Sequence, residues 1–360
     1  MKEFYLPFIV DIQTAYPEFY FDQSTLIDAL CDAWKDKVPN LKRLRLIHEN
    51  VKVDKRHIAT EVDKYLKFEN FDEKNNLYLK VATKIAIKSI ESILINNNIR
   101  PEEIQSLWSN TVTGFAIPSL EARVMNHFDF SSKTKRVPLM GLGCMAGVAG
   151  LNRVADYLKG HPDEAALFFS AELCSLTFQL NDTSAANLVA TGLFGDGAAA
   201  VLLVGDNHPL RKKAALKWEA SESIFFKDSQ DTMGWHVGAE GLKIILSKSV
   251  PDVVKNRLKD PMIHFLNDQN LNLRDISNFM THPGGPKVLS AMEELLGLNE
   301  SFLHHSWESL AQNGNMSSVS VLDIIHRTIQ ARTNEKPGEK CLAIAMGPGF
   351  SAEVGLYSWI

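Results

Sequence analysis

Three unbroken apolar runs limit what this chain can fold into. They span residues 165–169, 198–204 and 341–345, and none shows the alternation of a half-exposed strand. Strands buried on both faces read this way, and helical patterns lie between the runs, so we predict an α/β fold with sheets covered on both sides. The polar stretch 205–213 is the clearest break. It predicts an N-terminal half, residues 1–210, and a C-terminal half, residues 211–360.

Composition excludes several classes of protein. With 45% hydrophobic and 22% charged residues the chain reads as a globular enzyme, and its net charge of −5 gives no reason to expect a nucleic-acid partner. No apolar run is long enough for a membrane span, and Glu3 and Pro7 interrupt any signal-peptide pattern. The four cysteines are widely spaced without metal-ligand spacing. We therefore expect a cytoplasmic protein without a metal site.

Cys144 lies at a turn between a predicted strand and a predicted helix. Residues 136–140 read as the strand, and Gly141 and Gly143 form the turn. One face of the following helix carries Met145, Val148, Leu151, Val154, Ala155 and Leu158. Unpaired N–H groups and the helix dipole favour a thiolate at such a position, and glycines leave room for a substrate carbonyl. Cys144 is predicted to be a nucleophile; a packed core thiol is the alternative.

His282 and Asn315 stand at the starts of two further predicted helices. His282 ends an apolar stretch ahead of a helix that begins near Pro286, and Asn315 lies in the polar turn 312–318. Taken singly, they read as a loop histidine and a helix-capping asparagine. Together with Cys144 they provide a nucleophile, a proton or hydrogen-bond partner and an amide donor. This conjunction indicates a catalytic site.

Five motifs resemble those of type III polyketide synthases, the chalcone synthase superfamily. In order, they are Gly-Leu-Gly-Cys at 141–144, Phe-Gly-Asp-Gly-Ala-Ala-Ala at 194–200, His-Pro-Gly-Gly-Pro at 282–286, Gly-Asn-Met-Ser-Ser at 314–318 and Gly-Pro-Gly at 347–349. The resemblance runs from about Ser109 to the C-terminus, and more loosely before it. It implies the thiolase fold, two similar halves stacked in five αβαβα layers, with the cysteine in the first half and the histidine and asparagine in the second.

The resemblance also implies a reaction. A cysteine thiolate can take an acyl group from an acyl-CoA thioester. In the family, malonyl-CoA then loses carbon dioxide and its enolate condenses with that acyl group. We expect His282 and Asn315 to donate hydrogen bonds to the enolate oxygen, and an imidazolium–thiolate pair of His282 and Cys144 at rest. Acyl-CoA and malonyl-CoA are the expected substrates, and no cofactor is expected.

Other residues match positions that shape the family's active site. Phe194 matches a phenylalanine that gates the cavity, and Asp196 reads as scaffold. Ile117-Pro118 matches a segment, with a cis peptide in the family, through which one subunit completes its partner's site; the resemblance thus implies a homodimer. The other cavity positions are Thr113, Cys174, Thr177, Trp235, Ile244 and Ser317.

The phosphates of coenzyme A require cations. Lys287 directly follows the His-Pro-Gly-Gly-Pro motif and is the first candidate. Arg43, Arg45 and Arg56 belong to a basic stretch in the region where the family binds coenzyme A. The alternative reading of this stretch is a solvated surface.

Differences from the motifs of the plant members of the family indicate which acyl-CoA starter the chain uses. Ile244 replaces a second gatekeeping phenylalanine, Trp235 falls near a family glycine, and residues 345–349 read Ala-Met-Gly-Pro-Gly where the family has Gly-Phe-Gly-Pro-Gly. The combination resembles bacterial members that convert fatty acyl-CoA starters into alkylpyrones or alkylresorcinols. A medium- or long-chain fatty acyl starter is therefore expected.

Competing readings belong to other classes. A β-ketoacyl synthase III-like enzyme is disfavoured by His-Pro-Gly-Gly, and a hydroxymethylglutaryl-CoA synthase would need an acidic glutamate that the sequence does not reveal. A cysteine hydrolase shares the three residue types. A silent acyl-CoA-binding relative would retain the fold without turnover.

Overall fold

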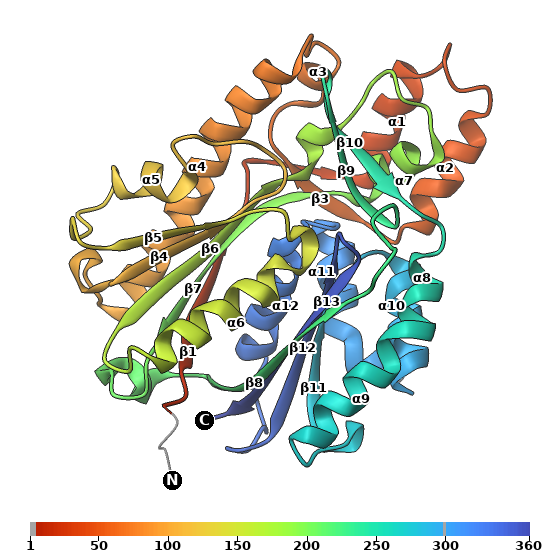
Figure 1. Cartoon of the computed structure of the whole chain (residues 1–360). Helices are drawn as coiled ribbons and strands as arrows, with labels where there is room; N and C mark the ends of the chain where they lie inside the picture. The colour runs from red at the N-terminus through yellow and green to blue at the C-terminus, as the bar shows by residue number, and fades with distance from the viewer. Residues whose placement is uncertain (1–4, 298–299) are drawn as a thin grey trace.

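A nine-stranded sheet runs through the protein. The computed structural model describes residues 5–297 and 300–360. The strand order is β11-β12-β13-β8-β1-β7-β6-β4-β5 (Figure 1). In chain order these strands are β1 (Phe8–Ala15), β4 (Ser106–Asn110), β5 (Lys135–Leu139), β6 (Ala165–Leu173), β7 (Asp196–Val204), β8 (Leu216–Phe225), β11 (Ile276–Thr281), β12 (Lys340–Gly347) and β13 (Ser351–Trp359). Two two-stranded sheets lie apart from it: β2 (Phe19–Asp22) with β3 (Lys55–Ile58), and β9 (Met233–Gly238) with β10 (Gly241–Leu246).

The sheet repeats one arrangement twice. β4 runs parallel to β6, which is antiparallel to β7, and β7 is antiparallel to β1. In the same senses, β11 is parallel to β12, β12 antiparallel to β13, and β13 antiparallel to β8. The two parts meet where β1 pairs with β8. This repetition is the two-half thiolase architecture. The boundary at residue 210 falls between β7 and β8, and the exact division stays a prediction.

Helices form three layers around the two parts of the sheet. Helices α6 (Ala146–Lys159) and α12 (Ser318–Gln330) lie side by side in the middle (Figure 1). On the outside, α4 (Phe71–Asn97) covers the N-terminal part, and α9 (Lys259–Asp268) and α10 (Pro286–Leu296) cover the C-terminal part. The remaining helices are α1 (Gln23–Ala33), α2 (Leu41–Asn50), α3 (Val62–Tyr65), α5 (Leu120–Met125), α7 (Ala185–Leu193), α8 (Val250–Val253) and α11 (His304–Asn313).

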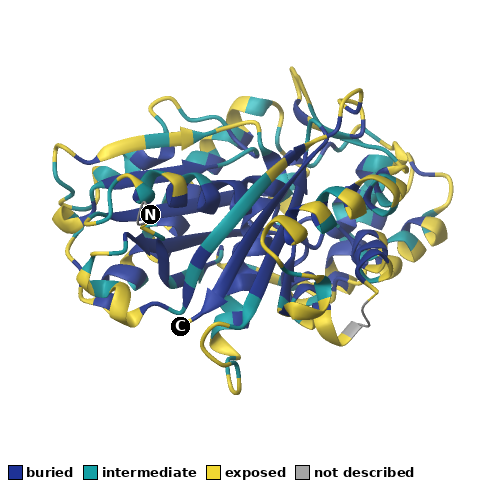
Figure 2. Ribbon diagram, turned by 60° about the horizontal axis from the view of Figure 1, so that its bottom comes forward, coloured by how far each residue is buried: buried dark blue, intermediate teal, exposed yellow. Residues whose placement is uncertain are grey.

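The unbroken apolar runs are explained by this layering. Successive strand side chains point to opposite faces, so in β6 Phe168 packs in the middle layer while Leu167 and Phe169 pack against α4. In β12, Ala343 faces the middle layer and Leu342 the outer one. Figure 2 shows most strands of the sheet buried, with β8 and the edge strand β5 partly exposed, and the outer helices exposed on one side. The predicted strands are confirmed, because both faces of the sheet are covered.

Among residues 5–297 and 300–360, no helix combines the length and the hydrophobicity of a membrane span.

Candidate active site

Cys144 is placed by a glycine turn between β5 and α6. Gly141 and Gly143 have φ of +86° and +57°, which other residues rarely adopt. A Cβ on Gly143 would also lie 2.3 Å from the ring of Pro348. Both the backbone conformation and the lack of space therefore require glycine at position 143. The cysteine follows in a short 3-10 turn, Gly143–Met145, that leads directly into α6.

His282 is fixed by its backbone at the end of β11. Its N–H donates to the Ile344 carbonyl (2.8 Å), and its own carbonyl accepts from the Gly284 N–H (3.0 Å). The ring is 2% exposed, and neither ring nitrogen has a hydrogen-bond partner. Both nitrogens are therefore available to a bound substrate.

Asn315 lies between α11 and α12 and is locked to the segment after α7. Its N–H donates to the Leu193 carbonyl (2.8 Å), and its carbonyl accepts from the Gly195 N–H (3.1 Å). Its side-chain oxygen accepts from the Ser317 N–H (2.8 Å), while its NH2 group makes only a 3.4 Å bond to the Gly284 carbonyl. The amide is thus oriented with its donor end left for another acceptor.

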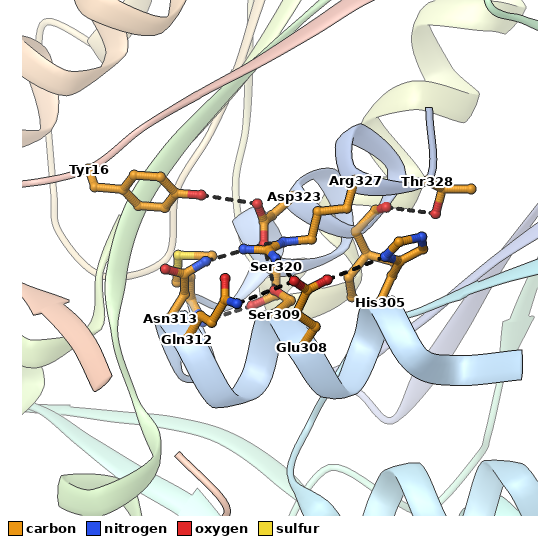
Figure 3. Close-up of polar contacts among 12 residues, drawn as sticks. Tyr16, His305, Glu308, Ser309, Gln312, Asn313, Ser320, Asp323, Arg327 and Thr328 are labelled. Atoms are coloured by element: carbon orange, nitrogen blue, oxygen red, sulfur yellow. Dashed lines mark hydrogen bonds and ion pairs between the residues drawn. The ribbon is translucent and has the colours of Figure 1, made fainter. Parts of the chain in front are cut away.

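A buried polar cluster around Asp323 clamps the two helices that flank Asn315 (Figure 3). The Asp323 carboxylate accepts from the Ser309 hydroxyl of α11 (2.7 Å), from the Tyr16 hydroxyl (3.0 Å) and from Arg327 Nε of α12 (2.9 Å). Arg327 also pairs with Glu308 of α11 (3.2 Å). Buried polar groups that satisfy one another in this way fix the relative position of the elements that carry them.

The three residues singled out from the sequence line one cavity, here called the catalytic cavity. Its wall also includes Phe194 and Trp235, whose ring centroids are 6.0 Å apart. Ile244 and Ser317 line it as well. These four were predicted cavity residues. Within residues 5–297 and 300–360, no lysine or arginine side chain lines this cavity.

A second cavity lies against the first and is here called the side cavity. Cys174, Phe194 and Ile244 line both cavities, so these three side chains form a shared wall. Thr177 lines the side cavity and donates its hydroxyl proton to the Cys174 carbonyl (2.7 Å). Most of the remaining lining is apolar: Leu26, Leu30, Ile58, Val62, Leu66 and Ala190.

Burial keeps Cys144 and His282 neutral when each is considered alone. It raises the pKa of Cys144 to about 11, with the Glu172 charge adding to the effect and Ser317 opposing it. It lowers the pKa of His282 to about 3. The expected resting imidazolium–thiolate pair is therefore not what burial favours. The two charges can arise only together, by transfer of the thiol proton to the ring, because each then offsets the other.

Glu172 is a buried acid that the sequence reading missed. Its carboxylate accepts from Thr113 Oγ1 (2.7 Å), the Val112 N–H (3.0 Å) and Ser318 Oγ (2.8 Å). Burial raises its pKa and these bonds oppose the shift. An acidic residue inside the apolar strand β6 is the signal that would have revealed it. Since its oxygens are taken up by these donors, we read it as scaffold.

Two predicted cavity residues lie elsewhere. Thr113 faces Glu172, and its hydroxyl also accepts from the Leu173 N–H (2.9 Å); its neighbour Val112 lines the catalytic cavity instead. The buried carboxylate binds the Thr113 side chain, and a role of Thr113 in substrate binding stays a prediction. Ile117 is 99% exposed and lines neither cavity of its own chain, and the Ile117–Pro118 bond is cis.

Asp196 behaves as the scaffold that the sequence suggested. Its carboxylate accepts from the N–H of Ser175 (2.8 Å) and from the Ser175 hydroxyl. Burial raises its pKa to about 7. It lines neither cavity.

The basic candidates for coenzyme A divide into exposed and buried ones. Lys287 is exposed in the first turn of α10, beside the Gly284 that lines the catalytic cavity. Arg43 and Arg45 are exposed on α2, and Arg45 pairs with Asp28 (2.7 Å). Arg56 is 4% exposed and donates to two backbone carbonyls. The fold buries the Arg56 guanidinium against the side cavity, and its contact with phosphate stays a prediction.

One group of possible metal ligands occurs among the described residues. His304, His305 and Glu308 lie together at the start of α11, outside both cavities. Glu308 is already paired with Arg327, whose positive charge disfavours a cation there.

Comparison with known proteins identifies the family. Residues 63–263 match the model of FAE1/type III polyketide synthase-like proteins, and residues 218–358 match the C-terminal domain of chalcone and stilbene synthases. The chain belongs to the type III polyketide synthases, and it is thus an acyltransferase that condenses malonyl-CoA units.

Relatives match over nearly the full chain. A 1,3,6,8-tetrahydroxynaphthalene synthase of Streptomyces peucetius subsp. caesius is 38% identical over 98% of this chain and 93% of its own. The α-pyrone synthesis polyketide synthase-like Pks18 of Mycobacterium tuberculosis is 27% identical over 98% and 91%. The crystal structure of 1,3,6,8-tetrahydroxynaphthalene synthase from Streptomyces coelicolor A3(2) superposes with a TM-score of 0.91 at 27% identity, covering 98% and 99%.

The reactivity of Cys144 should depend on His282. Among the described residues, no other side chain of the catalytic cavity can supply a positive charge, so in His282→Gln only the Ser317 hydrogen bond opposes the effect of burial and Glu172 on the thiol pKa. We expect alkylation of Cys144 by iodoacetamide at pH 7 to slow at least about tenfold, and to rise about tenfold per pH unit up to pH 9. Mass spectrometry of the Cys144 peptide measures this rate.

His236→Gln is the matched control for this measurement, since His236 is exposed on β9 outside the catalytic cavity. Equal rates for the wild type and His282→Gln between pH 6 and 8 would contradict the assignment of the cation to His282.

Proposed function

We propose that this synthase extends a medium- or long-chain fatty acyl-CoA with malonyl-CoA and cyclises the product to an alkylpyrone or alkylresorcinol. The supporting observation is the side cavity. It is lined mainly by apolar side chains and shares a wall with the cavity that holds Cys144. An apolar chain gains free energy on leaving water, about 0.8 kcal/mol for each buried CH2 group. A saturated acyl chain is therefore the ligand that suits this space.

The roles of the three catalytic residues follow from their placement. Cys144 attacks the thioester carbonyl of the starter, coenzyme A leaves, and the acyl group stays on sulfur. His282 takes the thiol proton as the sulfur attacks, which creates the charge pair that burial otherwise opposes, and passes that proton to the departing coenzyme A thiolate, so that the ring is neutral again. After malonyl-CoA loses carbon dioxide, His282 and the Asn315 NH2 group donate to the enolate oxygen. The enolate attacks the acyl carbonyl and releases Cys144.

Coenzyme A would lie with its phosphates near Lys287. This side chain is exposed beside Gly284, at the rim of the catalytic cavity, and has no ion-pair partner among the described residues. Arg43 and Arg45, exposed on α2, are further candidates. No organic cofactor is needed for this reaction, and the four free cysteines suit a reducing compartment such as the cytoplasm.

A homodimer is the assembly that fits the exposed surface. Ile117 is 99% exposed and Met140 is 61% exposed, although both are large and apolar. Met140 follows β5, the edge strand of the sheet, which has a neighbour on one side only. Exposed edges and apolar patches are typical of contact sites between copies. We infer that Ile117 reaches the partner's active site.

The starter is tested by the products. We expect purified enzyme, given malonyl-CoA and saturated acyl-CoA starters from hexanoyl to hexadecanoyl, to give pyrone or resorcinol masses that grow with the starter. The variant Ala190→Phe fills the side cavity, and should lower kcat/KM for dodecanoyl-CoA at least about tenfold relative to hexanoyl-CoA, since the loss of buried CH2 groups affects the longer chain. Ala185→Phe, exposed on the same helix, is the control.

Two outcomes would overturn this assignment. One is a tetrahydroxynaphthalene or phloroglucinol product made from malonyl-CoA with no acyl starter incorporated. The other is an Ala190→Phe enzyme that keeps the chain-length preference of the wild type.

Reversing the charge of Lys287 should weaken binding of coenzyme A thioesters. We expect Lys287→Glu to raise KM for malonyl-CoA about fivefold or more with little change in kcat, and the effect to shrink at 0.5 M salt because exposed charges are screened. Steady-state kinetics measure both constants. Lys259→Glu, exposed on α9, is the control; an equal KM for the two variants would remove Lys287 from the binding site.

The dimer is tested by sedimentation. The chain has a mass of 40.2 kDa, and we expect the wild type to sediment as two chains and Ile117→Asp as one, since a buried carboxylate opposes association. Ile95→Asp alters an exposed isoleucine on α4 and should stay dimeric. A monomeric wild type, or a dimeric Ile117→Asp, would contradict this surface as the interface.

A further inference from the structure

Two backbone segments carry the side chains that separate the two cavities. Phe194 directly follows α7, and Cys174 begins the 3-10 turn Cys174–Thr177 after β6. Both side chains line the catalytic cavity on one side and the side cavity on the other. Any group that fixes these two segments also fixes the opening between the cavities.

Arg56 holds the first of these segments. It comes from β3, and its guanidinium donates from Nη1 to the Phe194 carbonyl (2.6 Å) and from Nη2 to the Thr191 carbonyl. These carbonyls belong to the end of α7, where the last carbonyls of a helix lack partners within the helix and a cation is favoured. One guanidinium thus caps the C-terminal end of α7 and fixes the position of the Phe194 backbone.

Asp196 holds the second segment through Ser175. It binds both the N–H and the hydroxyl of Ser175, and the Tyr65 hydroxyl also contacts that serine. Arg56 and Asp196 are fully buried and act on each other through their charges without forming a direct ion pair. Burial lowers the pKa of Arg56 to about 10 while Asp196 opposes the shift, so the guanidinium stays charged at neutral pH.

The burial of this arginine needs a reason. A buried cation is costly unless polar groups surround it, and Arg56 Nε has no hydrogen-bond partner. A residue that only capped α7 could come from α7 itself and could use a single hydrogen bond. Arg56 comes from β3 instead and uses both terminal nitrogens on the last turn of α7. Lysine could reach only one of the two carbonyls, because it lacks the planar fork of arginine.

We propose that Arg56 is a positioning residue for starter selection: it sets the place of Phe194, and thereby the opening through which an acyl chain passes from the catalytic cavity into the side cavity. This role rests on the proposed function, in which the side cavity receives the starter. Arg56 also lines the side cavity. It sets the opening through Phe194 and does not touch the reacting atoms.

The test compares starters within each variant. Arg56→Met removes both hydrogen bonds, Arg56→Lys keeps the charge and one bond, and Arg100→Met removes an exposed arginine as the control. For each enzyme we would measure kcat and KM with hexanoyl-CoA and dodecanoyl-CoA, decarboxylation of malonyl-CoA without a starter, and thermal unfolding.

We expect the ratio of kcat/KM for dodecanoyl-CoA to that for hexanoyl-CoA to fall about tenfold or more in Arg56→Met and less in Arg56→Lys, with Arg100→Met like the wild type. Decarboxylation should fall by a smaller factor than this ratio, because it needs the His282 and Asn315 donors and no acyl chain.

A merely structural role predicts another pattern. Equal losses with both starters and in decarboxylation, or an unchanged ratio, would overturn the proposal. Should Arg56→Met fail to fold, the ratio in Arg56→Lys decides alone. If the wild type extends both starters and the variants leave the ratio unchanged, only this inference is contradicted. If the wild type extends neither starter, the proposed function is contradicted as well.

Discussion

Two backbone hydrogen bonds join the parts of the active site. Asn315 donates to the Leu193 carbonyl and accepts from the Gly195 N–H, so the turn that carries the amide is bound to the segment that carries Phe194. The turn with Asn315 belongs to the C-terminal half, and the segment with Phe194 belongs to the N-terminal half. A Cβ on Gly195 would lie 2.0 Å from the Asn313 carbonyl, which leaves glycine as the residue that fits this contact. The site exists because the halves approach this closely.

The electrostatics of the site follow from the same close packing. Burial opposes charge on Cys144 and on His282, and the catalytic cavity has no lysine or arginine to offset a thiolate. The charge of Glu172 acts on Cys144 and raises the pKa of the thiol further. A site of this kind stays neutral until proton transfer creates both charges together. It then stabilises an anionic enolate through neutral donors, without a competing fixed anion in the cavity.

Much of the fold and the catalytic residues could be predicted because their signals are local. The glycines before Cys144, the apolar runs of β6, β7 and β12, and the motifs around His282 and Asn315 are short patterns tied to a backbone conformation. The surroundings of Thr113 and Arg56 could not be predicted from local patterns. Each side chain is bound by a group distant in sequence, the Glu172 carboxylate in one case and the end of α7 in the other.

The sequence by itself determined the layering, the turn at the nucleophile and the set of catalytic residue types, since hydrophobic pattern and glycine placement act over a few residues. Only the tertiary structure decided that β4-β6-β7-β1 and β11-β12-β13-β8 repeat one arrangement, that a second apolar cavity adjoins the first, and that a basic residue of a charged stretch is buried. These features depend on contacts between residues distant in sequence, in the β1–β7 and β8–β13 pairs and between Arg56 and Phe194 more than a hundred positions apart, which no local pattern encodes.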